Sequence, residues 1–163
     1  MPKLPFNLFG ASNDEPRIHE LKELSLFKGL TVREIRELDD LLHERTYQKG
    51  EVIFDEGDTG LGLFLVVNGR VKISSSYSAL NQLAPEFGRG EFFGELALFD
   101  EAPRTARALA IEPTQIVALF RTEFFSLLER NHGMAAKILF ALSRTVCQRA
   151  RRLTMGEQRA PLL

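Results

Sequence analysis

The sequence predicts an α+β fold in which helices at both ends of the chain flank a run of short antiparallel strands. Between Tyr47 and Phe120, short apolar stretches alternate with turns containing Gly, Asn or Pro, which is typical of a β sandwich or barrel. On both sides of this region, apolar residues recur at intervals of three and four, the spacing of an amphipathic helix. With 163 residues and 44% hydrophobic content, the chain is long enough for one domain with a sizeable core.

The N-terminal part is predicted to be a flexible arm followed by helices. Residues 1–19 are assigned to the arm, because the first sixteen are rich in Pro, Asn, Gly and Ser. A helical segment is expected to begin near Glu20. Thr31 followed by Glu34 has the pattern of a capping box, and the apolar spacing after it predicts a helix from about Val32 to Glu44.

The central region is predicted to consist of short strands. Leu63 to Val67 is a continuous apolar run suited to a buried strand, and Val71 and Ile73 alternate with polar residues in the next one. The serine-rich stretch 74–78 is expected to be a linking loop without a chemical role. The segment 82–90 contains a proline, which predicts a shortened or edge strand.

The C-terminal part is predicted to be two helices and a tail. The first covers Thr122 to Arg130, and His132-Gly133 is expected to end it. A longer helix is predicted from about Met134 to Leu153, with an apolar face at intervals of three and four. We therefore place one domain at 20–155 and a tail at 156–163.

Composition excludes several functional classes. The net charge of −1 gives no independent sign of nucleic-acid binding. The single cysteine, Cys147, cannot form an internal disulfide and is expected to be a packing residue. No apolar run approaches the roughly 20 residues of a membrane span. Pro2 and Pro5 interrupt the N-terminus before a signal-peptide core. We expect a cytoplasmic protein without a membrane segment.

One stretch of fourteen residues, 93–106, gathers the groups that a small phosphorylated ligand needs. Gly94 allows close approach of the backbone, and Glu95 offers an acceptor for a sugar hydroxyl. The four apolar residues that follow can form one helical turn whose free amide groups favour an anion. Arg104 carries a planar fork that suits phosphate, and Thr105 adds a hydroxyl. Each residue taken alone is usually a surface, turn or core residue, so the ordered combination carries the prediction.

This combination resembles the phosphate-binding cassette of the cyclic nucleotide-binding domain family. The family pattern F-G-E-L-A, a short spacer and P-R-[TSA]-A corresponds to Phe93–Ala97 and Pro103–Ala106 without a gap. Glycines upstream, including Gly50, Gly57 and Gly69, fall where the family has turns between strands. The resemblance covers roughly residues 20–153 and implies an antiparallel β-roll, a jelly-roll-like barrel, with N-terminal helices and two C-terminal helices.

The resemblance implies a role for each cassette residue. Arg104 pairs with the cyclic phosphate and Glu95 accepts from the ribose 2′-hydroxyl. Backbone groups of further residues complete the ligand site, together with the Thr105 hydroxyl. These residues are Gly94, Leu96, Ala97 and Ala106. Thr105 is compatible with cAMP or cGMP, and we favour cAMP because it is the commoner ligand among small members of the family.

The resemblance also implies a surface for the base and a covering helix. The base is expected to lie against Val71 and Ile73, under a lid formed by the last helix at Thr145 and Arg149. The alternative for both lid residues is a solvated helix surface. Arg149 also belongs to a cluster with Arg144, Arg151 and Arg152, which could meet acidic ligands or nucleic acid, or merely complement the helix dipole.

Two positions depart from the family pattern. Leu61 stands where an acidic residue usually follows Gly60, and Arg107-Ala108 follows the cassette in place of Thr-Val. Neither change removes a group expected to contact the ligand. The alternative is a degenerate fold that acts as a protein-interaction module without ligand. The presence of both Glu95 and Arg104 argues against it, because a half-buried charge without its partner is costly.

Catalysis is not expected. A related cupin-like enzyme would need clustered metal ligands, whereas His19, His43 and His132 are scattered over predicted helices or their ends. We therefore predict no catalytic residue, no metal and no catalytic cofactor, with cAMP or cGMP as a ligand only. Few residues follow the domain, so no DNA-binding domain is expected in this chain. The signal is expected to be ligand-driven closure of the last helix, read by an effector protein or a homodimer partner.

Overall fold

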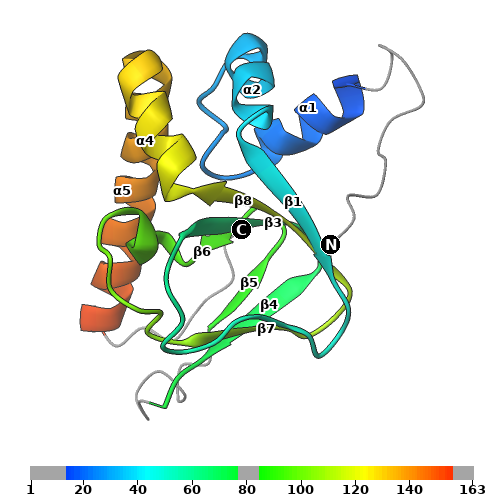
Figure 1. Cartoon of the computed structure of the whole chain (residues 1–163), viewed down its shortest axis with the longest axis vertical. Coiled ribbons are helices and arrows are strands. Elements are labelled where there is room, and N and C mark those ends of the chain that lie inside the picture. Colours follow the sequence, from blue (N-terminus) through cyan, green and yellow to red (C-terminus); the bar gives the residue numbers. More distant parts are fainter. Residues whose placement is uncertain (1–13, 77–84, 156–163) are drawn as a thin grey trace.

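Helices flank one side and one end of a two-sheet roll (Figure 1). The computed structural model describes residues 14–76 and 85–155. The helices are α1 (Asp14–Glu23), α2 (Val32–Asp39), the short 3-10 helix η1 (Glu95–Leu98), α4 (Arg121–Arg130) and α5 (His132–Met155). The strands are β1 (Leu42–Tyr47), β2 (Val52–Phe54), β3 (Gly62–Asn68), β4 (Arg70–Ser74), β5 (Glu86–Gly88), β6 (Phe92–Phe93), β7 (Arg107–Ala110) and β8 (Thr114–Phe120).

The strands form two four-stranded antiparallel sheets. One has the order β1-β8-β3-β6 and the other β2-β7-β4-β5. The predicted α+β fold with an antiparallel β-roll is confirmed. In the described residues β5 has three residues and pairs only with β4, so the shortened edge strand predicted from the proline is also confirmed.

Strand β3 is buried on both faces, which explains its continuous apolar sequence. Leu63 and Leu65 belong to the main core cluster with the helices, whereas Val66 belongs to a second cluster between the two sheets. Successive side chains of a strand point to opposite faces, so one strand serves both clusters. The second cluster joins both sheets and has aromatic residues at its margin. Its partly buried members are Tyr47, Ile53, Phe54, Phe64, Ile73 and Phe87.

The predicted helix from Val32 to Glu44 is wrong in its second half. The capping box is present, because Thr31 Oγ1 accepts from the Glu34 amide and Glu34 accepts from the Thr31 amide. The helix ends at Asp39, however, and β1 begins at Leu42. The residues of β1 pair with β8 along its whole length, from Leu42 opposite Leu119 onwards. This long-range ladder overrides the local helical spacing of the leucines.

The first helix begins earlier than predicted. Helix α1 starts at Asp14 rather than near Glu20, so residues 14–19 of the expected arm are helical. Two contacts hold this first part of the helix in place. Ile18 is buried in the main core, and Arg17 pairs with Asp39 and Glu44. The preceding residues of the arm and residues 156–163 of the tail lie outside the described residues.

The break between the last two helices is also shifted. Asn131, not His132-Gly133, separates α4 from α5, and its side-chain oxygen accepts from the Met134 amide at 3.1 Å. An asparagine in this position caps the start of a helix. Cys147 is exposed on α5, so its expected packing role is wrong. Over residues 14–76 and 85–155, no helix combines the length and apolar character required to cross a membrane.

Candidate functional site

The cassette begins with a left-handed glycine. Gly94 follows β6 and has φ 73° and ψ 18°, a conformation that favours glycine, and it precedes η1. A Cβ atom added to Gly94 would lie 2.7 Å from Nη1 of Arg104. The space beside this glycine is therefore taken by the guanidinium of Arg104, ten residues further along the chain, and its close approach to a ligand stays a prediction.

Arg104 is a buried cation held by backbone carbonyls. Its Nη1 donates to the Gly94 oxygen and its Nη2 to the Gly62 oxygen, each at 2.9 Å. The residue is 9% exposed, and its Nε is buried without a partner among the described residues. No carboxylate of the described residues lies within the 4.0 Å of an ion pair with it. The site thus contains a desolvated positive charge without a carboxylate in direct contact among the residues that the structure describes.

Aromatic faces and burial set the electrostatics of Arg104. Its guanidinium carbon lies 4.2 Å from the ring centre of Phe54 and 5.3 Å from that of Phe64. Burial lowers the pKa of Arg104 from its ordinary value, while the negative charges of Asp58 and Glu95 act in the opposite direction. An arginine stays protonated despite such a shift, so the group remains a cation.

Glu95 lies at the start of η1 and reaches the last helix. Its Oε1 accepts from Nη1 of Arg149 at 2.8 Å, and the two side chains are 14% and 27% exposed. Arg149 also donates to the Phe92 carbonyl and lies over the rings of Phe92 and Phe87, at 4.3 Å and 5.0 Å from their centres. Residues far apart in the sequence therefore join α5 to the cassette.

The remaining cassette residues differ in exposure. Leu96 and Thr105 are exposed, whereas Ala97 and Ala106 are buried. The Thr105 carbonyl accepts from Ser75 Oγ at 3.0 Å, which ties the cassette to the end of β4. The exposed position of the Thr105 side chain leaves its hydroxyl accessible from solvent.

The residues predicted to contact the base are not equally accessible. Val71 is fully buried in the cluster between the sheets, whereas Ile73 is half-buried at its margin. On α5, Arg149 lies against the cassette, as described above. Thr145 is half-buried one turn earlier, and its hydroxyl donates to the Ala141 carbonyl at 3.1 Å.

Several residues of the site were not predicted from the sequence. The Gly62 carbonyl has no sequence signal, since every residue carries a carbonyl oxygen. Phe54 and Phe87 are ordinary strand residues by pattern, yet their rings contact Arg104 and Arg149. At the departure from the family pattern, the side chain of Leu61 is 60% exposed, and the carbonyl of the next residue, Gly62, accepts from Arg104.

Comparison with known protein families decides which family this arrangement represents. Over residues 44–131, more than half of the chain, the sequence matches the family model described as "Cyclic nucleotide-binding domain". The chain belongs to the cyclic nucleotide-binding domain family. The match includes the whole cassette and the strands of both sheets, apart from the first two residues of β1.

Relatives of this cyclic nucleotide-binding domain occur in several kinds of protein. The chain is 36% identical over 121 residues to the cyclic AMP receptor protein of Thermus thermophilus, covering 71% of this chain and 56% of that protein. It is 32% identical over 94 residues to the cAMP-dependent protein kinase regulatory subunit of Mycosarcoma maydis, covering 58% of this chain and 18% of that protein. The chain thus spans about half or less of the length of these relatives.

Solved structures support the same fold. The catabolite activator protein of Thermus thermophilus superposes with a TM-score of 0.68 at 31% identity, over 81% of this chain and 61% of that chain. A cyclic nucleotide-binding domain from Methylobacillus flagellatus KT superposes with a TM-score of 0.75 at 23% identity, over 91% and 88% of the two chains. The second likeness concerns the fold alone.

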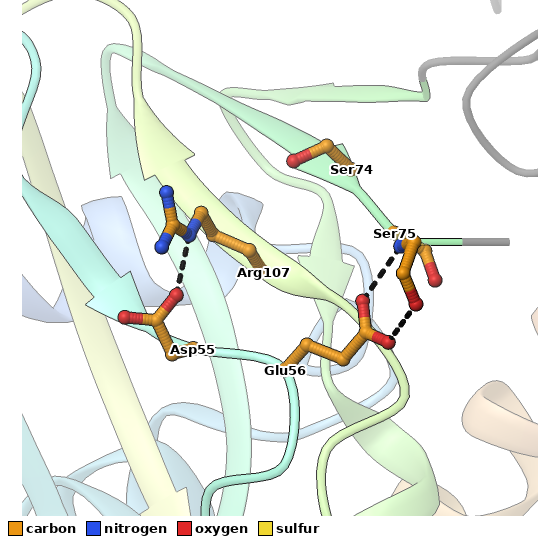
Figure 2. A pocket seen from close by; sticks show the side chains of 6 residues that line it. Asp55, Glu56, Ser74, Ser75 and Arg107 are labelled. Carbon is orange, nitrogen blue, oxygen red and sulfur yellow. Dashed lines mark hydrogen bonds and ion pairs between the residues drawn. The ribbon is translucent and has the colours of Figure 1, made fainter.

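A separate polar pocket lies on the outer face of the second sheet (Figure 2). It has a volume of about 320 Å³, and Arg107 pairs in it with Asp55. Ala108 points into the core between the sheets, so its neighbour Arg107 points the opposite way. The other lining residues are Glu56, Ser74, Ser75 and Ser76. The exposed Arg107 therefore lies in a different environment from the buried Arg104, although only two residues separate them.

The serine-rich stretch forms part of this pocket rather than a plain link. Glu56 accepts from the amide and the hydroxyl of Ser76. These bonds lower the pKa of Glu56, since they favour its charged form. Tyr77 and Ser78 lie outside the described residues. Among the residues that the structure does describe, no group of three or more His, Cys, Asp or Glu side chains is placed to hold a metal ion.

Proposed function

We propose that this chain is a non-catalytic receptor domain that binds a cyclic mononucleotide, with cAMP favoured over cGMP. The observation that carries this proposal is the environment of Arg104, a buried cation with no carboxylate partner among the described residues and an unpartnered Nε. Leaving such a donor unsatisfied costs about 1–3 kcal/mol. A phosphate oxygen in contact with this guanidinium would supply both the missing acceptor and the missing counter-charge.

Glu95 is the proposed partner of the ribose. Only Oε1 of its carboxylate is bonded to Arg149, and no described group donates to Oε2. A carboxylate can accept several hydrogen bonds, so a 2′-hydroxyl can bind Glu95 while the ion pair stays intact. Gly94 lies between the proposed phosphate and ribose partners, because its carbonyl accepts from Arg104 and its peptide precedes Glu95. One ligand that carries both groups would therefore bridge Arg104 and Glu95.

The preference for cAMP rests on the relatives, whereas Ile73 suits the base of either nucleotide. Two of the relatives are named for cAMP, although a cGMP-dependent protein kinase of Homo sapiens is also similar, at 33% identity over 103 residues. The half-buried Ile73 offers an apolar surface to a base, with α5 as its cover. The exposed Thr105 hydroxyl suits the phosphate of either nucleotide.

Closure of α5 is the proposed signal. The Glu95–Arg149 pair joins the cassette to α5, and ligand bound to Glu95 would stabilise this docked arrangement. A ligand shifts such an equilibrium only by the difference between its affinities for the docked and undocked states. The half-buried ion pair supplies that difference, because it orients the carboxylate that accepts the ribose hydroxyl.

Removal of Arg149 tests the closure mechanism. In the wild-type chain, cAMP is expected to increase hydrogen-exchange protection of residues 134–153. In Arg149→Ala this gain should be largely lost, while cAMP binding weakens only by about two- to tenfold, because Arg104 is untouched. Arg144→Ala is the matched control, since Arg144 is exposed on the same helix. An equal gain in protection in wild-type and Arg149→Ala chains would contradict closure through this pair.

We infer that a second copy of the chain is the partner that reads this signal, through the outer face of α5. Uncharged residues recur there with alternating spacings of four and three, and Phe140 among them is 73% exposed. They are Ala136, Phe140, Ser143, Cys147, Ala150 and Thr154. This spacing is typical of a coiled-coil seam. The basic residues that border this row of uncharged residues lie on one side of it only. In an antiparallel pair of helices these basic residues would face each other, whereas in a parallel pair they would not.

Cysteine crosslinking tests the parallel arrangement. In a parallel dimer Cys147 meets its own counterpart across the seam, so mild oxidation should yield a covalent dimer of the wild-type chain. Phe140→Glu should abolish the crosslink, because it places a charge in the seam, and it should leave the monomer folded, since Phe140 is exposed. A wild-type chain that stays monomeric in sedimentation and forms no crosslink would contradict the dimer.

A further inference from the structure

A stack of phenylalanine rings lies behind the guanidinium of Arg104. Phe54 lies 5.6 Å from Phe64, and Phe64 lies 5.5 Å from Phe93, as measured between ring centres. The first two rings also contact Arg104, and Phe54 does so at the shorter distance of 4.2 Å. Phe54 comes from β2 and is only partly buried, so its ring belongs to the margin of the cluster between the sheets.

Phe54 replaces part of the stabilisation that a carboxylate gives to a buried arginine. The charge of Arg104 has two carbonyl oxygens and two ring faces as its partners within the described residues. A cation over an aromatic face gains more when the cation is desolvated, as the buried Arg104 is. Without the Phe54 ring, burial of an arginine with an unpartnered Nε becomes unfavourable, and the side chain is expected to turn towards solvent.

We propose that Phe54 is a positioning residue for phosphate recognition: its ring holds Arg104 in place before the ligand arrives. The proposal rests on the proposed function, because it concerns the same arginine. An arginine that is already fixed loses less conformational entropy when the ligand binds. The ring achieves this without competing for the anion, whereas a carboxylate partner would have to be displaced or would repel the phosphate.

Substitutions that keep or remove the aromatic face separate positioning from packing. Phe54→Leu keeps an apolar side chain but removes the ring, and Phe54→Tyr keeps the ring. Tyr47→Leu is the control for loss of an aromatic residue from the same cluster, since Tyr47 is packed against that cluster, whereas the rings over Arg104 in the described part of the chain are those of Phe54 and Phe64. Three quantities are measured for each variant: the Kd for cAMP, the thermal midpoint, and the NMR signal of the Arg104 Nε–H group with its rate of exchange with solvent.

Phe54→Leu is expected to raise the Kd by about three- to tenfold. This change corresponds to the entropic cost of ordering one long side chain when the ligand binds. It should also shift the Nε–H resonance downfield, because the ring current is lost, in a chain that remains folded. Phe54→Tyr should stay within about twofold of the wild-type Kd, and Tyr47→Leu should lower the midpoint while changing the Kd by no more than that.

An unchanged or lower Kd in Phe54→Leu, or an equal rise in Tyr47→Leu, would overturn the positioning role. The Arg104 Nε–H signal tests the positioning role independently of the proposed receptor function. If the wild-type chain binds no cyclic nucleotide, the receptor proposal fails. In that case faster exchange of the Arg104 Nε–H with solvent in Phe54→Leu than in the wild type still supports the positioning of Arg104, and an unchanged exchange rate overturns it.

Discussion

Replacement of Arg104 by alanine is expected to weaken cyclic nucleotide binding by about ten- to a hundredfold. A charge-assisted hydrogen bond contributes about 1.5–3 kcal/mol, and each 1.4 kcal/mol corresponds to a tenfold change in Kd. The free energy of unfolding should change by less than about 1 kcal/mol, because two hydrogen bonds are lost but a buried charge without a counter-ion is removed as well. Calorimetric titration and denaturant unfolding measure the two effects.

Arg107→Ala is the matched control for this substitution. It removes the same charge three residues away, but the Arg107 side chain is 52% exposed and pairs with Asp55 on the outer face of the sheet. An exposed ion pair contributes little, so the Kd should stay within about twofold of the wild-type value. Equal losses in Arg104→Ala and Arg107→Ala would mean that net charge, rather than contact with the phosphate, determines the affinity.

Replacement of Gly94 by alanine is expected to damage the site as much as loss of Arg104. At φ 73° a Cβ atom strains the backbone, which costs about 1–2 kcal/mol of stability. The same Cβ would lie 2.7 Å from Nη1 of Arg104, so the guanidinium must move away from the Gly94 and Gly62 carbonyls. We expect cAMP affinity to fall by about tenfold or more, since the phosphate contact moves with it.

Gly50→Ala separates backbone strain from displacement of the arginine. Gly50 also has a positive φ, 89°, but a Cβ atom there would meet nothing within 4 Å. This variant should lose about 1–2 kcal/mol of stability through strain and keep its affinity for cAMP. If Gly94→Ala kept its affinity as well, the assigned position of Arg104 beside Gly94 would be wrong for the binding state.

The sequence predicted the elements whose signals are local. The alternation of strands and turns and the capping box at Thr31 and Glu34 are carried by neighbouring residues. The structure brings the predicted residues Gly94, Glu95 and Arg104 into one site, and the predicted lid residue Arg149 contacts Glu95. The ligand roles of these residues stay predictions.

Features that depend on distant partners could not be predicted in the same way. The leucines after Asp39 continue a helical spacing, and only the ladder with β8, more than sixty residues away in sequence, makes them a strand. One of the two carbonyl partners of Arg104 belongs to Gly62, which lies 42 residues upstream and has no side-chain signal. In the sequence, Phe54 cannot be distinguished from other apolar strand residues, because its position over the guanidinium of Arg104 depends on the folded structure.

Calorimetric titration of the wild-type chain with cAMP and cGMP tests the central claim most directly. We predict saturable binding of one nucleotide per chain with a Kd in the micromolar range or below, and tighter binding of cAMP than of cGMP. A cyclic dinucleotide serves as the control for binding of any cyclic phosphate. No saturable binding of cAMP or cGMP at millimolar concentration would contradict the receptor function and favour an interaction module that works without a ligand.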